Sequence, residues 1–325
     1  MQVSFPSFVK SFLLGLALVL LLTTQAQAQL PALVDADWLK SQLDREDLVI
    51  LDVRSSIDQG GDRAAFEAGQ IPGSVYSSYT DDGWRENRGG VVGLLPATAS
   101  LERLIGSLGI SNDSLVVVVP AGSGPTDFGS AARIYWTFKL LGHDQVTLLN
   151  GGVRGWEQAG YALVAGAAHY EPARFQANLR AELLTTAEQV SERLSTRPAS
   201  LVDSRPAAFF TGETQAGPVA SPGTLPGAVN FEYQKFMVER DGVWYLDEEI
   251  LSRQLASSGL RQEDDLVSFC NTGHWAATNW FALSELAGLE GVSLYDGSMA
   301  EWASDSSREL QVPPRGLARL LNYFN

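Results

Sequence analysis

The sequence contains a single cysteine, Cys270, among its 325 residues. One cysteine cannot form an internal disulfide, and it cannot supply the C-x-x-C pair of a dithiol oxidoreductase. The chain also has only three histidines. Cys270 and His274 are too few for a zinc site, which needs four protein ligands, or three and a water. We therefore expect no metal and no cofactor.

Basic residues are also in short supply. The chain has 23 Lys and Arg against 38 Asp and Glu, which gives a formal net charge of −15. Nucleic acids and anionic membrane surfaces attract basic proteins, so both are excluded as expected partners. A small anionic ligand would need a local positive potential that offsets the overall negative field.

Long apolar runs are absent except at the N-terminus, where residues 1–28 have the pattern of a signal peptide. Lys10 precedes the apolar stretch from Phe12 to Leu22, and Ala26-Gln27-Ala28 fits a cleavage site. The apolar stretch of about eleven residues is shorter than the ~20 needed to cross a bilayer. We expect an exported, periplasmic protein that keeps no membrane anchor after cleavage.

A two-fold repeat organises the rest of the chain. Each half opens with an apolar strand that ends in Asp-x-Arg, continues to a Pro-Gly turn, a helix, an apolar strand, a loop and a long helix, and closes with a tryptophan. The matching landmarks are Asp52 and Asp203, Pro72 and Pro226, Gly142 and Gly288, and Trp156 and Trp302. Strands that alternate with helices predict α/β domains with mainly parallel sheets and helices on both faces. We predict two such domains in tandem, residues 30–165 and 185–325, joined by a linker at 166–184.

Cys270 lies where the second half turns from a strand into a helix. Leu266 to Phe269 form an apolar run typical of a buried strand, and a helical pattern follows that ends near Gly288. Backbone N–H groups at such a turn lack intrahelical acceptors, and the helix dipole is positive there, so the turn binds anions and lowers the pKa of a thiol. We interpret Cys270 as a nucleophile. The alternative is that it is a small buried apolar side chain.

The first half has no thiol at the matching position. Its loop, residues 120–129, is several residues longer and rich in glycine. We therefore predict that the chemistry belongs to the second half, with the first half supporting it.

In this order of motifs the chain resembles the tandem-domain rhodanese family, the thiosulfate and 3-mercaptopyruvate sulfurtransferases. The likeness covers nearly the whole chain after the signal segment. It includes the Asp-x-Arg openings, Ile-Pro-Gly and Leu-Pro-Gly, Leu-Asn-Gly-Gly at 149–152, and Tyr-Asp-Gly-Ser at 295–298 ahead of Glu301-Trp302. In that family the active cysteine is the first residue of a six-residue loop in the second domain, and Cys270 to Trp275 fits that frame.

The resemblance implies a two-step sulfur transfer. The Cys270 thiolate takes the outer sulfur of a small anionic donor, 3-mercaptopyruvate or thiosulfate, and a cyanide or thiol acceptor then removes it from the cysteine persulfide. The persulfide would be cradled by backbone amides of the loop Asn271, Thr272, Gly273, His274, Trp275 and Ala276, as in an oxyanion hole. The alternative is a non-catalytic persulfide carrier or binding module for an exported partner. The oligomeric state is not indicated.

The residues after the cysteine bear on the donor. Relatives that use thiosulfate resemble one another in an Arg-Lys pair there, and mercaptopyruvate users have Gly-Ser. Here the pair is the uncharged Asn271-Thr272, which favours mercaptopyruvate or another singly charged donor, since a lost charge-assisted contact costs about 1.5–3 kcal/mol. Arg205 matches the family arginine that reaches the donor, whereas the family's second arginine is replaced by Phe209.

Several of these residues also have plainer interpretations. Arg205 is either a donor ligand or a structural partner of Asp203. His274 either tunes the thiolate as an imidazolium or lines the mouth of the site, and we favour lining. Thr272 either caps the turn or relays a proton. Asp296 and Ser298 are expected to hold a turn beside the loop.

A cysteine phosphatase also uses a thiolate in an anion-binding loop. Such an enzyme needs an arginine late in the loop to bind phosphate through two parallel hydrogen bonds. Residues 271–279 contain no arginine, which argues against this activity.

Overall fold

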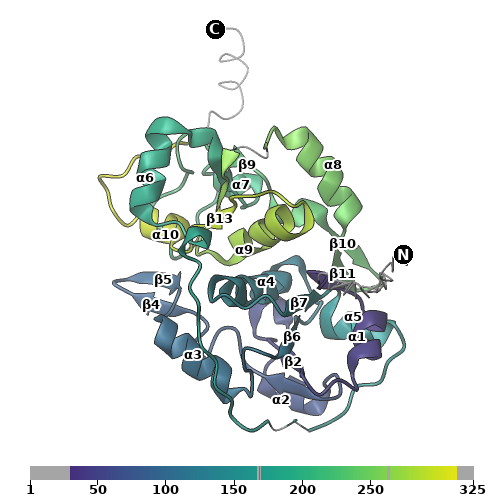
Figure 1. Cartoon of the computed structure of the whole chain (residues 1–325). Helices are drawn as coiled ribbons and strands as arrows, with labels where there is room; N and C mark the ends of the chain where they lie inside the picture. Colours follow the sequence, from purple (N-terminus) through teal and green to yellow (C-terminus); the bar gives the residue numbers. More distant parts are fainter. Residues whose placement is uncertain (1–29, 167, 169, 262–263, 313–325) are drawn as a thin grey trace, which may run out of the picture.

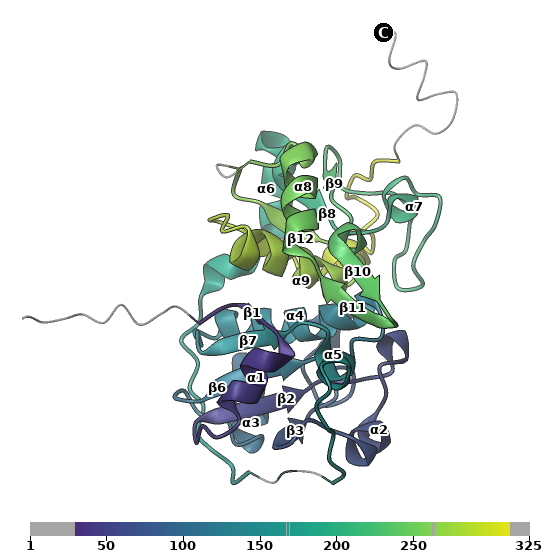
Figure 2. The same ribbon diagram turned by 90° about the vertical axis from the view of Figure 1, so that its right-hand side faces the viewer.

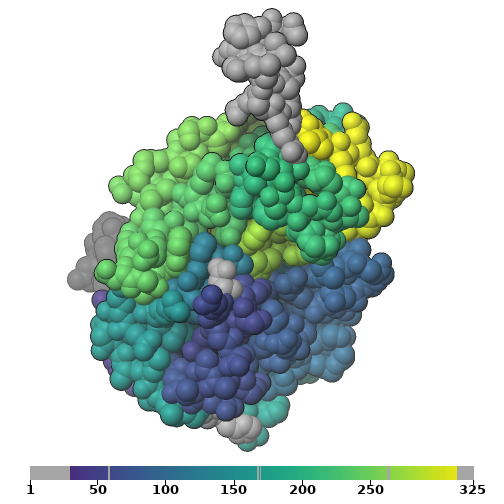
Figure 3. Space-filling model, turned by 180° about the vertical axis from the view of Figure 1, so that it is seen from behind, coloured from purple at the N-terminus to yellow at the C-terminus, as the bar shows by residue number. Residues whose placement is uncertain are grey.

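The computed structural model describes residues 30–166, 168, 170–261 and 264–312. The predicted signal peptide, residues 1–28, and the C-terminal residues 313–325 lie outside the described residues. Two α/β domains follow one another along the chain and pack together, the first below the second in Figure 1. In the space-filling view they meet along a continuous seam (Figure 3).

The first domain is built on a five-stranded parallel sheet in the order β1-β7-β6-β2-β3. A separate antiparallel hairpin, β4 and β5, projects beside it. Its elements are β1 (Leu33–Val34), α1 (Ala36–Gln42), β2 (Leu48–Asp52), α2 (Arg63–Ala68), β3 (Ser74–Tyr76), β4 (Glu86–Arg88), β5 (Val91–Leu94), α3 (Thr98–Ser107), β6 (Leu115–Val119), α4 (Pro125–Leu140), β7 (Val146–Leu149) and α5 (Gly152–Gln158).

Strand β6 explains why helices cover both faces of this sheet. Its five residues, Leu-Val-Val-Val-Val, are all buried, and alternate side chains enter opposite cores. Val116 and Val118 face α3 and α4, whereas Leu115, Val117 and Val119 face α1 and α5. A strand buried on both sides must be apolar at every position, which is why its sequence does not alternate.

The second domain repeats this plan on a four-stranded parallel sheet in the order β13-β12-β8-β9, with an antiparallel hairpin of β10 and β11. Its elements are α6 (Ala187–Thr196), β8 (Leu201–Asp203), α7 (Ala207–Phe210), β9 (Val229–Asn230), β10 (Met237–Arg240), β11 (Val243–Leu246), α8 (Glu248–Ser258), β12 (Val267–Phe269), α9 (His274–Trp280), a π-helical continuation η6 (Phe281–Leu286), β13 (Ser293–Leu294) and α10 (Ser298–Trp302). The predicted fold class, two tandem α/β domains with mainly parallel sheets, is confirmed.

The two domains share one apolar core. Helix α4 of the first domain lies beside α9 of the second (Figures 1 and 2). Phe281 packs edge-on against Tyr135, with ring centroids 4.9 Å apart, and against Phe128 at 5.9 Å. The buried side chains on this side of both sheets form a single connected cluster. The loop that follows β12 therefore begins inside an interface, not at an open surface.

The segment predicted as a linker is attached to the first domain. Ala173 and Asn178 donate backbone hydrogen bonds to the carbonyls of Gly106 and Leu141. Phe175 is buried in the shared core. Helix α6 then begins with a capping box formed by Thr186 and Gln189. Gln189 occupies the N3 position, from which its side chain reaches back to the backbone of the N-cap Thr186.

Among the described residues, no helix combines the length and apolar character that crossing a membrane requires.

Candidate functional site

Cys270 follows β12 directly and opens the loop that leads into α9. Its main-chain carbonyl accepts a hydrogen bond from the N–H of Met299, and that of Asn271 accepts from Ala300. Gly273 is the N-cap of α9 in the left-handed conformation, with φ of 71°. The predicted strand-turn-helix is thus present, but the cap is Gly273 and not Thr272. The Cys270 side chain is 1% exposed.

Ser298 ties the loop to the start of α10. Its hydroxyl oxygen accepts hydrogen bonds from the N–H groups of Cys270 at 3.0 Å and Gly273 at 3.1 Å, and its O–H donates to the carbonyl of Tyr295 at 2.8 Å. Ser298 has φ of 50°, a costly conformation for a residue other than glycine. One buried hydroxyl therefore fixes both ends of the Cys270–Gly273 turn, as expected for a residue beside the loop.

Other amides of the loop remain available. The backbone N–H groups of Asn271 and Thr272 have no hydrogen-bond acceptor among the described residues. The first N–H groups of α9, from His274 to Ala276, have no intrahelical acceptor because of their position. These groups supply the donors that a bound sulfur anion would need; their part in cradling one stays a prediction.

His274 joins the loop to the first domain. Its Nε2 lies 2.8 Å from the carbonyl oxygen of Thr126, and its Nδ1 lies 2.9 Å from the hydroxyl of Tyr79. A carbonyl only accepts, so Nε2 carries the proton and Nδ1 accepts from the Tyr79 O–H. Burial lowers the pKa of His274 to about 3, and the positive charge of Arg85 contributes to the shift. The imidazole is therefore neutral and buried: it neither lines an open mouth nor acts as an imidazolium.

Arg133 is the second link from the first domain. This α4 side chain is fully buried, and its Nη1 donates to the carbonyl of Gly273 at 3.0 Å. Its Nη2 lies 3.3 Å from the carbonyl of Gly93 and 3.6 Å from a carboxylate oxygen of Asp296. A Cβ on residue 273 would clash with this guanidinium and lie 2.6 Å from the Asp296 carbonyl, so only glycine fits there. Burial lowers the pKa of Arg133, while the charge of Asp296 opposes the shift.

Arg205 is buried and mostly engaged within its own domain. Its Nε and Nη2 donate to the carboxylate of Asp203, and Nη2 also donates to the carbonyl of Gly223. Its Nη1 reaches Asn271 Oδ1 at 3.3 Å. These contacts give Arg205 a structural role that anchors the loop; its role as a donor ligand stays a prediction.

The same pattern occurs in the first domain. There Arg54 binds Asp52 and the carbonyl of Gly69 in the same way. The duplicated Asp-x-Arg motif thus supports the turn after β2 in the first half and after β8 in the second.

Aromatic side chains occupy the position at which rhodanese relatives have their second arginine. Phe209 packs against the edge of Trp275, with centroids 5.8 Å apart, and Trp275 stacks on Tyr233 at 5.1 Å. This side of the loop therefore offers apolar contact in place of a positive charge.

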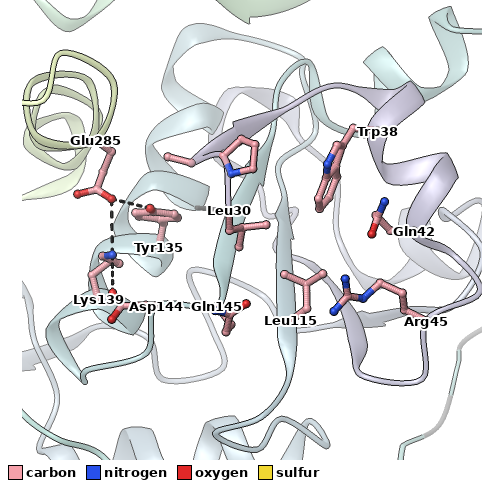
Figure 4. A pocket seen from close by; sticks show the side chains of 12 residues that line it. Leu30, Trp38, Gln42, Arg45, Leu115, Tyr135, Lys139, Asp144, Gln145 and Glu285 are labelled. Carbon is pink, nitrogen blue, oxygen red and sulfur yellow. Dashed lines mark hydrogen bonds and ion pairs between the residues drawn. The ribbon is translucent and has the colours of Figure 1, made fainter. Parts of the chain in front are cut away.

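A cavity of about 990 Å³ lies elsewhere, between α4, η6 and the start of the described chain (Figure 4). Its charged groups are already paired, Arg45 with Asp47 outside the lining and the others with one another. Lys139 contacts Asp144 and Glu285, and Tyr135 donates to Glu285. No residue of the Cys270 loop lines this cavity. We therefore assign the site by its chemistry and not by the size of the cavity.

No group of three or more His, Cys, Asp or Glu side chains placed to hold a metal ion occurs in the described part of the chain. The polar groups around Cys270 are instead hydrogen-bond donors and guanidinium groups, which suit an anion.

Comparison with known proteins identifies the fold. The rhodanese-like domain matches this chain twice, at residues 35–159 and 186–305. The chain belongs to the rhodanese-like domain family. The probable 3-mercaptopyruvate sulfurtransferase of Pseudomonas aeruginosa is 34% identical over 281 residues, 85% of this chain and 96% of the relative. The bovine thiosulfate sulfurtransferase is 37% identical over 64% of this chain and 69% of its own length.

The structural comparison agrees. The crystal structure of the 3-mercaptopyruvate sulfotransferase SseA from Escherichia coli superposes with a TM-score of 0.70 at 26% identity, covering 83% of this chain and 99% of that one. This rhodanese is accordingly a sulfurtransferase, with sulfur donor and acceptor substrates.

Sequence reasoning missed the residues that this rhodanese contributes from its first domain. Tyr79 and Thr126 have no distinctive local pattern, so nothing in the sequence points to them. Arg133 does have one, because it is a lone charge within the otherwise uncharged run from Phe128 to Phe138. A charge in a helix that is buried all round requires a polar partner.

Proposed function

We propose that this sulfurtransferase moves sulfane sulfur from a small anionic donor to a thiophilic acceptor through a persulfide on Cys270. The observation that carries the proposal is the placement of Cys270 as the first residue of a turn held by Ser298, with the unpaired amides of Asn271 and Thr272 and the N-terminus of α9 directly behind it. Such a turn stabilises an anion through fixed dipoles.

The chemistry takes two displacement steps. The Cys270 thiolate attacks the outer sulfur of the donor and an S–S bond forms. The bond from that sulfur to the rest of the donor breaks, and its electron pair leaves with sulfite, or with the enolate of pyruvate, which then takes up a proton. Cyanide or a thiolate next attacks the outer sulfur of the persulfide and restores the Cys270 thiolate. The two steps predict ping-pong kinetics.

We propose 3-mercaptopyruvate as the better donor. Asn271 and Thr272 carry no charge, and the Asn271 side chain is turned toward Arg205. Neither side chain offers the cation that a doubly charged donor favours. The relative of Pseudomonas aeruginosa that spans nearly the same length carries the mercaptopyruvate name.

Access to the thiol requires local movement. Cys270 is 1% exposed and belongs to the core shared by both domains. The loop contacts the first domain through His274 and Gly273. We propose that the donor enters at this seam when the side chains there separate.

The test compares wild type with Cys270→Ser, using 3-mercaptopyruvate and thiosulfate as donors and cyanide as acceptor. We expect the wild type to gain the mass of one sulfur atom with donor alone and to lose it on adding cyanide. The Ser variant should do neither. A wild type that gains sulfur but never releases it is a carrier, and one that gains none overturns the proposal. A higher kcat/KM for thiosulfate contradicts only the choice of donor.

We also propose that the protein is exported. The support is the basic, apolar and Ala-x-Ala pattern of residues 1–28. Fractionation of expressing cells and N-terminal sequencing test it: we expect a periplasmic protein that begins at Gln29, and an intact Met1 in the cytoplasm contradicts it.

A further inference from the structure

Arg85, just before β4, is a charged side chain without a partner next to the active loop. It makes no hydrogen bond or ion pair with any described residue, and its Nε is buried. Its guanidinium lies over the ring of Tyr79, whose centroid is 5.2 Å away. A guanidinium loses solvation when it is half-buried, and such a group normally recovers that free energy through an anion.

A small cavity lies in front of this guanidinium. It measures about 220 Å³ and is lined by Thr80, Arg85, Asn87 and Gly93. Drug-sized ligands occupy roughly 300–1,000 Å³, so a cavity of this size suits a molecule of a few heavy atoms. The lining offers the Asn87 amide and the Arg85 guanidinium, which are groups that bind a carboxylate or a sulfur oxyanion, whereas the Thr80 hydroxyl already donates to Asp81.

The cavity adjoins the loop that begins at Cys270. A Cβ on Gly93 would clash with the Arg85 guanidinium and would lie 2.8 Å from the carbonyl oxygen of Thr272. Gly93 is therefore the contact between the hairpin and the loop. Thr272 is two residues from Cys270, a separation of at most about 7 Å along the backbone.

Two guanidinium groups, those of Arg85 and Arg133, approach Gly93 although the protein carries −15 overall. Arg133 lies on the other side of Gly93 and contacts its carbonyl. Its single described ion-pair partner is Asp296, and its Nε has no partner either. Asp296 thus offsets the charge of Arg133 but is not paired with Arg85, and the charge of Arg85 contributes to lowering the pKa of Arg133. This is the local potential that a small anion requires in an acidic protein.

We propose that the cavity beside Gly93 binds the anionic end of the sulfur donor, with Arg85 as its charged ligand. The first domain then contributes a substrate contact that takes the place of the arginine lost at Phe209. The inference rests on the proposed sulfur transfer, and it places the carboxylate or sulfonate oxygens of the donor on the hairpin while the sulfur points to Cys270.

The test compares Arg85→Gln and Arg85→Lys with the control Arg88→Gln. Arg88 lies on the same hairpin but is exposed and paired with Glu86. With 3-mercaptopyruvate or thiosulfate and cyanide, we expect Arg85→Gln to raise the donor KM about ten-fold or more and to leave the cyanide KM within two-fold. Arg85→Lys should keep part of the affinity for the donor, because lysine keeps the positive charge but lacks the paired N–H donors of the guanidinium. The control should match wild type. An unchanged donor KM, or an equal rise in both KM values, overturns the proposal.

A binding measurement separates this inference from the proposed function. Calorimetry follows thiosulfate binding to Cys270→Ser, which cannot react, with and without Arg85→Gln. We expect thiosulfate to bind about ten-fold or more weakly to the double variant Cys270→Ser/Arg85→Gln than to Cys270→Ser. Added salt should weaken thiosulfate binding only when Arg85 is present. If wild type transfers no sulfur but this difference appears, the binding site stands and the proposed function fails. If sulfur transfer occurs and Arg85 changes neither binding nor KM, the site fails alone.

Discussion

His274 Nε2 donates a hydrogen bond to the carbonyl oxygen of Thr126 across the seam between the two domains, at 2.8 Å. This hydrogen bond attaches the loop that follows Cys270 to α4 of the first domain. Gly129, one turn further along α4, allows the imidazole to approach closely, since a Cβ there would lie 2.9 Å from Nε2. The first domain, which has no cysteine, is thus in direct contact with the loop that begins at Cys270.

Removing this link should loosen the loop. In His274→Ala the buried Thr126 carbonyl and Tyr79 hydroxyl lose their partner, which we expect to cost about 2–4 kcal/mol in the free energy of unfolding by urea. Cys270 should also react with iodoacetamide faster than the slow rate expected of a thiol that is 1% exposed. Tyr79→Phe, which removes one donor, should cost about 1 kcal/mol. Equal alkylation rates in wild type and His274→Ala would show that this bond does not control access.

The neutral state of His274 makes stability depend on pH. Its pKa is about 3 in the folded protein, below the ordinary value of 6.5. The unfolded chain therefore binds a proton that the folded chain does not between pH 6.5 and 3, so stability is full above 6.5 and falls as the pH drops. At up to about 1.4 kcal/mol per pH unit, wild type should lose about 2 kcal/mol more than His274→Gln between pH 6.5 and 5.

Comparing the two proteins removes the contribution of His143, whose pKa is also lowered by burial. Denaturant unfolding at several pH values provides the measurement. Parallel stability curves for wild type and His274→Gln would mean that the imidazole takes up a proton in the folded state.

Ser298 should matter to both stability and turnover. Ser298→Ala leaves the N–H groups of Cys270 and Gly273 without their acceptor inside the protein. We expect a loss of about 1–3 kcal/mol and a lower kcat, because the turn no longer holds one geometry. Ser304→Ala, which removes an exposed hydroxyl bonded to Glu301, is the matched control. The result that contradicts this view is a Ser298→Ala protein with unchanged kcat.

Breaking the buried pair of Arg133 and Asp296 from one side should be costly. Arg133→Met leaves a carboxylate in the interface and removes the donor to Gly273, so we expect a loss of about 3–5 kcal/mol. The double variant with Asp296→Asn should recover part of it. Asp144→Asn breaks a more exposed Arg–Asp pair, with Arg180, together with a contact to Lys139, and should cost about 1 kcal/mol or less. If Arg133→Met and the double variant are equally unstable, the charge pairing contributes nothing.

The sequence of this protein determined a great deal by itself. Apolar strands that end in Asp-x-Arg, Leu48–Asp52 and Leu201–Asp203, recur in both halves, so period and duplication predicted two parallel α/β domains. The turn from Phe269 to His274 was also predictable, because strand and helix signals meet at Cys270. These features depend on residues that are close together in the chain, and their pattern can be read directly from the sequence.

Only the tertiary structure decided what surrounds the thiol. Tyr79, Thr126 and Arg133 contact the loop from more than a hundred residues away, Arg85 lies beside Gly93 next to it, and no local pattern marks where these side chains go. The same packing makes His274 neutral. The physical reason is that protonation and pairing depend on burial and on which charges lie within a few ångströms, and the docking of one domain on the other sets both.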